Sequence, residues 1–195
     1  MKEPLLYKII RPIIKIIMKY IFKAQYIGLE NIPSTGRVVL AGNHTNNLDC
    51  LLIISSTKRV VHFLAKDSLM KGMKRIIFKN MGIIPVNRKI HDSDALSNAK
   101  DVLNNEGLIG IFPEGTINRT KNIIMPFKIG SVKMAYDTES VIVPFIIKGN
   151  YKIFGKKLKI EFLPSYKPIS HNNDLTEANE QLMKIIKNKL KEKRD

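Results

Sequence analysis

The sequence predicts a single α/β domain with a mixed, mainly parallel sheet flanked by helices, preceded by an amphipathic helical segment at the amino terminus. Three observations lead to this prediction. From residue 37 onward, short apolar runs alternate with helix-like segments, as in sheets whose strands are joined by helices. The 195 residues suffice for one core, and they contain no internal repeat or low-complexity linker. The first 25 residues differ from the rest in being strongly basic and rich in isoleucine.

Residues 4–23 form the basic amphipathic segment. Projected at about 100° per residue, its five cations fall within roughly 120°, and apolar side chains fill most of the remainder. The cations are Lys8, Arg11, Lys15, Lys19 and Lys23. A cation on every turn argues against a membrane-spanning helix and against a cleavable signal sequence. We expect a helix lying in the membrane interface, with packing on the domain's own core as the alternative.

Pro12 should kink that helix or divide it into two pieces. We therefore divide the chain into an interfacial segment, 1–25, and a folded domain, 26–195.

The elements expected in the domain follow from their apolar patterns. The strands are Arg37–Ala41, Val60–Ala65, Ile83–Val86, Leu108–Phe112, Val141–Ile147 and Leu158–Phe162. The helices between them are Leu48–Ser55, Lys66–Met81, Ser93–Asn105 and Phe127–Asp137. A last helix is expected after Asp174, where Glu177 completes a capping-box pattern. Its apolar positions suit docking on the domain: Leu175, Leu182, Ile185, Ile186 and Leu190.

The formal charge of +16 predicts a polyanionic partner, such as an anionic lipid surface, a phosphorylated substrate or nucleic acid. Nucleic acid is disfavoured, because only 7% of the residues are aromatic and the chain contains no recognised nucleic-acid motif. Cys50 is the single cysteine, so no internal disulfide can form, and a reducing, cytosol-facing location is the simplest interpretation. No metal-binding cluster is apparent, and we expect no cofactor.

The first motif with chemical potential is Gly42-Asn43-His44, directly after an expected strand, with Asp49 five positions beyond the histidine. In α/β folds, sites form at the carboxyl ends of strands. A carboxylate that reaches one imidazole nitrogen fixes the tautomer of the ring, so that the other nitrogen can take a proton from a substrate hydroxyl. Alone, a histidine and an aspartate at this spacing are weak evidence.

Two further motifs lie at strand ends. Phe112-Pro113-Glu114-Gly115-Thr116 places a carboxylate, a glycine and a hydroxyl on one turn, although an ordinary solvated turn would look the same. Gly82-Ile83-Ile84-Pro85-Val86-Asn87-Arg88 places an arginine, whose planar group suits phosphate, just past a strand. A surface arginine is the commoner case.

In this order and spacing, the three motifs resemble those of the 1-acylglycerol-3-phosphate acyltransferase family. The similarity runs from about residue 26 to residue 148, and it includes Gly28-Leu29-Glu30-Asn31-Ile32-Pro33, Pro126-Phe127-Lys128-Ile129-Gly130 and Val143-Pro144-Phe145. The resemblance implies an enzyme of phospholipid biosynthesis, with residues 26–195 as an acyltransferase domain. It would move a fatty acyl group from a thioester, acyl-CoA or acyl carrier protein, to the hydroxyl of lysophosphatidate. It would work as a peripheral protein on the cytoplasmic face of the membrane.

The resemblance also assigns roles to residues. It implies that His44 is the general base and Asp49 its orienting partner, with no covalent acyl-enzyme. Residues implied to bind the acceptor are Arg88, Glu114, Gly115 and Thr116, with Lys66, Lys128 and Arg119 as secondary contacts. Cys50 is not expected to be a nucleophile, and the histidines outside the motifs, His62, His91 and His171, are expected to be structural or solvated.

One position departs from the family pattern. The third motif usually continues with arginine and serine after Glu-Gly-Thr, whereas here Ile117 and Asn118 follow, and the next arginine is Arg119. Isoleucine cannot bind a phosphate, so another lysophospholipid or a lyso-aminolipid is the alternative acceptor. A non-catalytic, basic membrane-binding protein is the alternative from a different class.

Overall fold

Seven strands form one mixed sheet in the computed structural model, which describes residues 4–67, 72, 78, 80–86, 93–155, 157–170 and 174–192. In chain order the strands are β1 (Gln25–Ile27), β2 (Val38–Gly42), β3 (Val61–Lys66), β4 (Ile84–Val86), β5 (Leu108–Ile111), β6 (Val141–Lys148) and β7 (Lys159–Phe162). Their order across the sheet is β1-β7-β6-β2-β5-β3-β4. All described strand pairs are parallel except β6–β7, so five parallel strands are extended at one edge by two that run the other way. The predicted fold class is confirmed.

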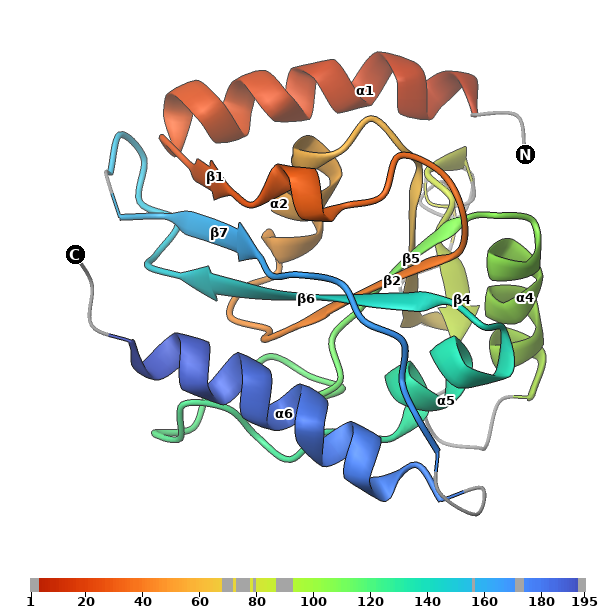
Figure 1. Ribbon diagram of the computed structural model, residues 1–195. Coiled ribbons are helices and arrows are strands. Elements are labelled where there is room, and N and C mark those ends of the chain that lie inside the picture. The colour runs from red at the N-terminus through yellow and green to blue at the C-terminus, as the bar shows by residue number, and fades with distance from the viewer. Residues whose placement is uncertain are drawn as a thin grey trace.

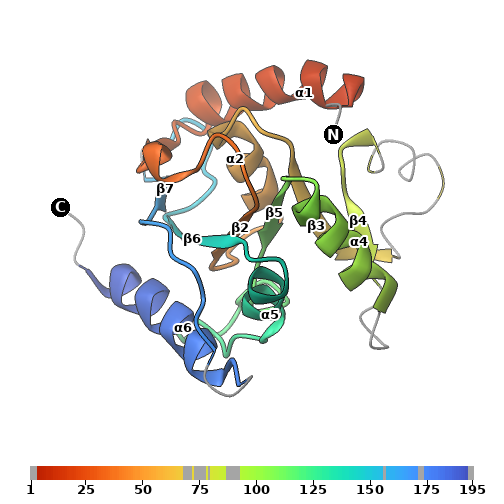
Figure 2. The ribbon, with the colours of Figure 1, turned by 45° about the vertical axis from the view of Figure 1, so that its right-hand side comes forward.

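Helices cover both faces of this sheet (Figure 1). On one face lie α1 (Leu5–Ile16), its π-helical continuation η1 (Ile17–Ile21) and α2 (Asp49–Ser56). On the other lie α4 (Ser93–Asn104), α5 (Gly130–Asp137) and α6 (Thr176–Lys191), as the turned view in Figure 2 also shows. A short 3₁₀ turn, η2 (Leu29–Asn31), follows β1.

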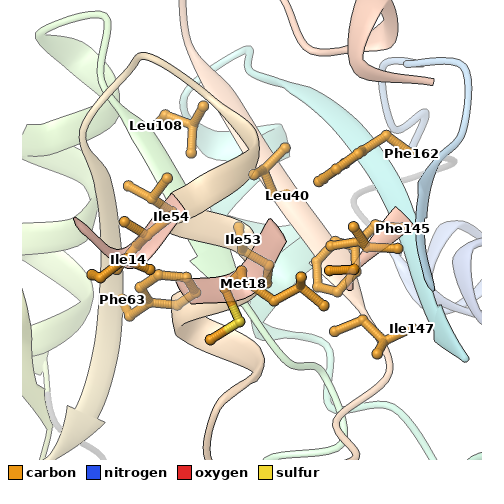
Figure 3. Close-up of a cluster of buried hydrophobic side chains, with 14 of the residues drawn as sticks. Ile14, Met18, Leu40, Ile53, Ile54, Phe63, Leu108, Phe145, Ile147 and Phe162 are labelled. Atoms are coloured by element: carbon orange, nitrogen blue, oxygen red, sulfur yellow. The ribbon is translucent and has the colours of Figure 1, made fainter. Parts of the chain in front are cut away.

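The strands divide their side chains between two cores, because successive residues of a strand point to opposite faces. In β2, Val38 and Leu40 join the core beneath α1 and α2, whereas Val39 and Ala41 join the core with α4, α5 and α6. Figure 3 shows the first core, where Met18 lies among side chains of β2, β6 and β7. Both faces of β2 are fully buried, which explains its continuous apolar sequence.

Most predicted elements are confirmed to within one or two residues, with three differences. β1 was not predicted. Helix α5 begins at Gly130, three residues after the expected start at Phe127. The helix predicted for 66–81 lies largely outside the described residues, and its first residue, Lys66, instead ends β3.

Pro12 does not divide the amino-terminal helix, so that alternative was wrong, and a kink at Pro12 stays a prediction. Helix α1 continues through Pro12 to Ile16. The missing amide removes one hydrogen bond, and the packing of α1 against α2 and the sheet offsets this cost.

The helix formed by α1 and its continuation η1 has two apolar sides. Tyr7, Ile14 and Met18 are buried against the domain, as the core-packing alternative required. The opposite side carries a second apolar row, which we call the outward stripe: Leu5, Ile9, Ile13, Ile16 and Tyr20, each more than half exposed. Within the described residues, no helix has the length and apolarity required to cross a membrane.

Candidate active site

The predicted motif lies at the carboxyl end of β2, the strand between β5 and β6. Gly42 is in close contact with Phe145 of β6: a Cβ at this position would lie 2.4 Å from the Phe145 carbonyl oxygen. Asn43 then continues the strand pairing with its side chain. Its Nδ2 donates to the carbonyl of Ile147 (2.9 Å), and the Ile147 N–H donates to its Oδ1 (2.7 Å). The buried side-chain amide of Asn43 thereby fixes the point at which the chain leaves the sheet, and with it the position of the next residue, His44.

His44 and Asp49 form the predicted pair. The His44 Nδ1 lies 2.8 Å from the Asp49 Oδ2, and the Asp49 carboxylate is fully buried, whereas the His44 side chain is 15% exposed. The backbone N–H groups of Thr45 (2.6 Å) and Asn46 (2.8 Å) also donate to Oδ2. These hydrogen bonds compensate for the burial of the carboxylate and hold it in one position.

The ring of His44 is also fixed on its face. Phe112, just beyond the end of β5, stacks on the imidazole with ring centroids 3.9 Å apart and planes 9° apart. Because Nδ1 donates to Asp49, the neutral ring has its basic lone pair on Nε2. The arrangement can therefore accept a proton at Nε2 while Asp49 stabilises the resulting imidazolium.

Glu114 holds the backbone of His44. It is 5% exposed, and its two carboxylate oxygens accept the backbone N–H groups of His44 (2.9 Å) and Met125 (2.8 Å). The loop from Glu114 to Met125 is also bonded to His44, because the Asn118 N–H donates to the His44 carbonyl (2.9 Å). The geometry thus gives Glu114 a positioning role that the sequence did not indicate. Its assignment to the acceptor stays a prediction.

Tyr151 is a member of the site that the sequence interpretation missed. Its hydroxyl donates to the Asp49 Oδ1 across 2.6 Å, and the Thr45 hydroxyl donates to the same oxygen (3.1 Å). Burial, and then the neighbouring Asp49 carboxylate, raise the pKa of Tyr151 above its usual range, so its hydroxyl remains a donor. No local motif marks Tyr151. It reaches Asp49 only because β6 lies beside β2 and ends at the same edge.

Cys50 does not have the properties of a nucleophile. Burial, and then the adjacent Asp49 carboxylate, raise the pKa of its thiol to about 12. The reactive thiolate is therefore a trace species near neutral pH. This agrees with the prediction from the sequence.

The other predicted substrate-binding residues that the structure describes lie at the edge of the sheet formed by the carboxyl ends of the parallel strands. Some are close to His44 and others are further from it. Gly115 has a left-handed backbone (φ +73°), and a Cβ there would lie 3.1 Å from the Lys128 Nζ, so the two residues are in close proximity. Thr116 and Arg119 are exposed, and Arg119 follows directly after Asn118, which bonds to His44. Lys66 is exposed at the end of β3, with β5 between it and β2.

Three predicted or discussed residues lie outside the described part of the chain: Arg88, His91 and His171. His62 is described, and it has a structural contact: its Nδ1 donates to the Gly82 carbonyl (2.8 Å). Burial lowers the pKa of His62, which favours the neutral ring.

An open pocket lies beside the motif. Its wall includes Asn43 and Thr45, the two chain neighbours of His44, together with Ile123, Ile147 and Gly149. Thr45 therefore contacts both Asp49 and the pocket.

The geometry shows a hydrogen-bonded histidine and aspartate at a sheet edge, and comparison with known proteins identifies the class of protein. The acyltransferase family model matches residues 23–148, close to the range of the resemblance, and the chain belongs to this family. The predicted family is thereby confirmed.

Among curated proteins, this chain is similar to several 1-acyl-sn-glycerol-3-phosphate acyltransferases. A 1-acyl-sn-glycerol-3-phosphate acyltransferase of Borreliella burgdorferi is 37% identical over 134 residues, which are 67% of this chain and 53% of the relative. The protein of that name from Bacillus subtilis is 26% identical over 95% of this chain and 98% of its own length. The match covers about half the length of the Borreliella protein, and likewise of the human and bovine proteins named 1-acyl-sn-glycerol-3-phosphate acyltransferase alpha, which are 27% identical to this chain.

A solved structure shares the fold. The 1-acyl-sn-glycerophosphate (LPA) acyltransferase PlsC of Thermotoga maritima superposes with a TM-score of 0.76 at 21% identity. The match covers 95% of this chain and 80% of that one.

Proposed function

We propose that this protein transfers a fatty acyl group from an acyl thioester to the free hydroxyl of lysophosphatidate, giving phosphatidate. The observation that carries the proposal is the 2.8 Å hydrogen bond between His44 and the fully buried Asp49. The proposed acceptor comes from the relatives, which are named 1-acyl-sn-glycerol-3-phosphate acyltransferases. The Bacillus subtilis protein among them matches over nearly its whole length.

The reaction follows from the positions of the two side chains. The Nε2 of His44 takes the proton of the acceptor hydroxyl as its oxygen attacks the thioester carbonyl. Asp49 holds Nδ1–H and stabilises the imidazolium. The tetrahedral intermediate then collapses with cleavage of the C–S bond. The leaving sulfur takes the proton from the His44 imidazolium and departs as a free thiol, which leaves His44 neutral. Neither a metal nor a covalent acyl-enzyme takes part in these steps.

The acceptor phosphate would be bound by cations at the same edge. Lys128 is adjacent to Gly115, and Arg119 follows a residue bonded to His44. Arg88, Lys66, Thr116 and Glu114 complete the proposed set. Ile117 favours a second candidate, the same chemistry on another lysophospholipid or a lyso-aminolipid, because it removes the cation expected at that position.

Thiol release tests the reaction and its acceptor together. Protein would be supplied with acyl-CoA or an acyl carrier protein thioester, and with lysophosphatidate or a panel of other lysophospholipids. We expect release with lysophosphatidate that is lost in His44→Ala. Release with a different acceptor alone would support the second candidate. Release with no acceptor above the His44→Ala level would overturn the enzymatic proposal in favour of a membrane-binding protein.

We also propose that the protein binds the cytoplasmic face of an anionic membrane as a peripheral protein, through the outward stripe of α1. The stripe is apolar, more than half exposed at each position, and lies beside exposed lysines such as Lys15 and Lys19. Such an arrangement suits an interfacial helix, with apolar groups in the acyl layer and ammonium groups among the headgroups.

Substitution tests this better than deletion, because α1 and η1 also supply buried Tyr7, Ile14 and Met18 to the core. The double variant Ile9→Ser/Ile13→Ser should lose sedimentation with vesicles that contain phosphatidylglycerol. The matched control is Lys184→Ser/Lys187→Ser in α6, on the opposite face of the sheet, which should retain most of it. Equal binding by the wild type and the α1 variant would contradict the proposal.

A further inference from the structure

The turn between β6 and β7, described over residues 149–155 and 157–158, presents two large apolar side chains to solvent. Ile153 is 62% exposed and Phe154 is 67% exposed. Adjacent residues with this much exposed apolar surface, at the tip of a turn, require an explanation in terms of a partner.

This turn is attached to the end of the amino-terminal helical segment. The Phe154 N–H donates to the Ile21 carbonyl across 2.6 Å, and Ile21 ends η1 directly after Tyr20 of the outward stripe. Figure 1 shows the turn, in pale blue, beside that end of the helix. The exposed side chains of the turn and the outward stripe of α1 therefore belong to one region of the surface.

The base of the turn is held in place. Tyr151 packs edge-on against Phe22 with ring centroids 5.8 Å apart, and its hydroxyl bonds to Asp49. Phe154 has a left-handed backbone (φ +54°), which is rare for a bulky residue. Strained positions persist where the surroundings fix them, and they cluster at sites of function. Phe154 combines such a position with an exposed aromatic side chain.

The charge around the turn favours an anionic surface. The stretch 148–160 contains no acidic residue, and Lys152 and Lys157 are exposed on the turn. Lys19 and Lys23 are exposed on the adjoining segment. Exposed apolar side chains among lysines match the two requirements of a bilayer interface, an apolar layer below and anionic headgroups above.

We propose that the β6–β7 turn is a second lipid-contacting element, which inserts Ile153 and Phe154 into an anionic bilayer beside α1. The inference rests on the proposed membrane binding by α1, and it adds a contact two residues from Tyr151, the partner of Asp49. A lipid acceptor leaving the bilayer at this turn would thus arrive at the edge of the sheet that carries His44.

The sequence contains no tryptophan, which makes a direct test possible. Three proteins, each with one tryptophan, would be compared: Phe154→Trp in the turn, Ile9→Trp in the outward stripe, and Ile169→Trp as the control. Ile169 is 69% exposed and follows Tyr166, which pairs with Ile142 at the far end of β6 from the turn. Emission is recorded with vesicles of phosphatidylglycerol or phosphatidylcholine, with and without brominated acyl chains.

With phosphatidylglycerol vesicles, we expect a blue shift and bromine quenching for Phe154→Trp and Ile9→Trp, and neither for Ile169→Trp. A response of Ile9→Trp without one from Phe154→Trp overturns the role of the turn and leaves α1 binding intact. No response from either tryptophan overturns membrane binding as a whole. A blue shift of Phe154→Trp that appears without lipid and grows with protein concentration overturns the lipid assignment in favour of a second copy of the chain.

A loss-of-contact variant provides the second measurement. Ile153→Ser/Phe154→Ser should lower the partition coefficient for phosphatidylglycerol vesicles about tenfold, because two apolar side chains no longer enter the acyl layer. Ile169→Ser should leave it unchanged. Thermal unfolding checks that both variants fold. An unchanged partition coefficient in a folded double variant contradicts the proposal.

Discussion

Asp49 and Glu114 are both buried carboxylates that contact His44, yet they act on different parts of it. Asp49 bonds to the imidazole, whereas Glu114 bonds to the backbone N–H and to the loop that follows β5. The first contact fixes which ring nitrogen carries the proton. The second fixes the position of the His44 backbone and therefore of its ring. The histidine thus has one carboxylate that contacts its ring and another that positions it, and substitution can separate the two.

Asp49→Asn should have the largest effect in this comparison. An amide in place of the carboxylate presents an N–H group to Nδ1 or removes the charge that stabilises the imidazolium, so Nε2 no longer acts as the base. We expect kcat to fall about 10²–10⁴-fold with a small change in KM. Steady-state thiol release measures this. A fall of less than about fivefold would show that Asp49 does not support the ring chemically.

Glu114→Gln should affect stability as well as activity. The glutamine oxygen can still accept one backbone N–H, but its NH₂ group opposes the other, so the His44 or Met125 amide loses its partner. An unsatisfied buried amide costs about 1–3 kcal/mol, which corresponds to a Tm lowered by roughly 2–10 °C. Calorimetry measures the Tm. A normal Tm with a raised KM would instead support the prediction that Glu114 binds the acceptor.

Tyr151→Phe should have a smaller effect than either carboxylate substitution. It removes one hydrogen bond to Asp49 Oδ1, while the Thr45 hydroxyl still donates to that oxygen. We expect kcat to fall about three- to tenfold, equivalent to about 1 kcal/mol. The raised pKa of Tyr151 means that this contribution does not titrate near neutrality, so the ratio of wild-type to variant kcat should stay constant between pH 6 and about 9. A ratio that changes with pH in that range would contradict the donor role.

Cys50→Ala should have the smallest effect. With a thiol pKa of about 12, Cys50 carries almost no thiolate at pH 7–8. Activity should therefore remain within about twofold of the wild type, and iodoacetamide should not inhibit the enzyme. Loss of activity in a variant with a normal Tm would revive an acyl-cysteine intermediate.

The sequence predicted this site unevenly, for physical reasons. His44 and Asp49 are five residues apart, so a local pattern was sufficient to pair them. Tyr151 reaches Asp49 only through the pairing of β6 with β2, which local sequence does not encode. Glu114 was found, but its backbone partners depend on how the loop to Met125 folds back.

The helices and strands were also predicted unevenly, according to whether local sequence determines them. Long apolar runs such as Val141–Lys148 were easy to predict, because burial of both faces leaves a continuous hydrophobic pattern. Strand β1 was missed, since its three residues lie at an edge and are mostly exposed. The amphipathic pattern of α1 predicted either core packing or membrane contact, and the structure shows that a wide apolar sector can bury one side and expose another.

A double-mutant cycle measures whether His44 and Asp49 act as one unit in proton transfer. The kcat of acyl transfer would be measured for the wild type, His44→Ala, Asp49→Ala and the double variant, with calorimetry to confirm that each folds. If the pair acts as one base, the double variant should be no slower than His44→Ala, within about threefold. Losses that multiply in the double variant would show that the two residues act independently, and would contradict the account.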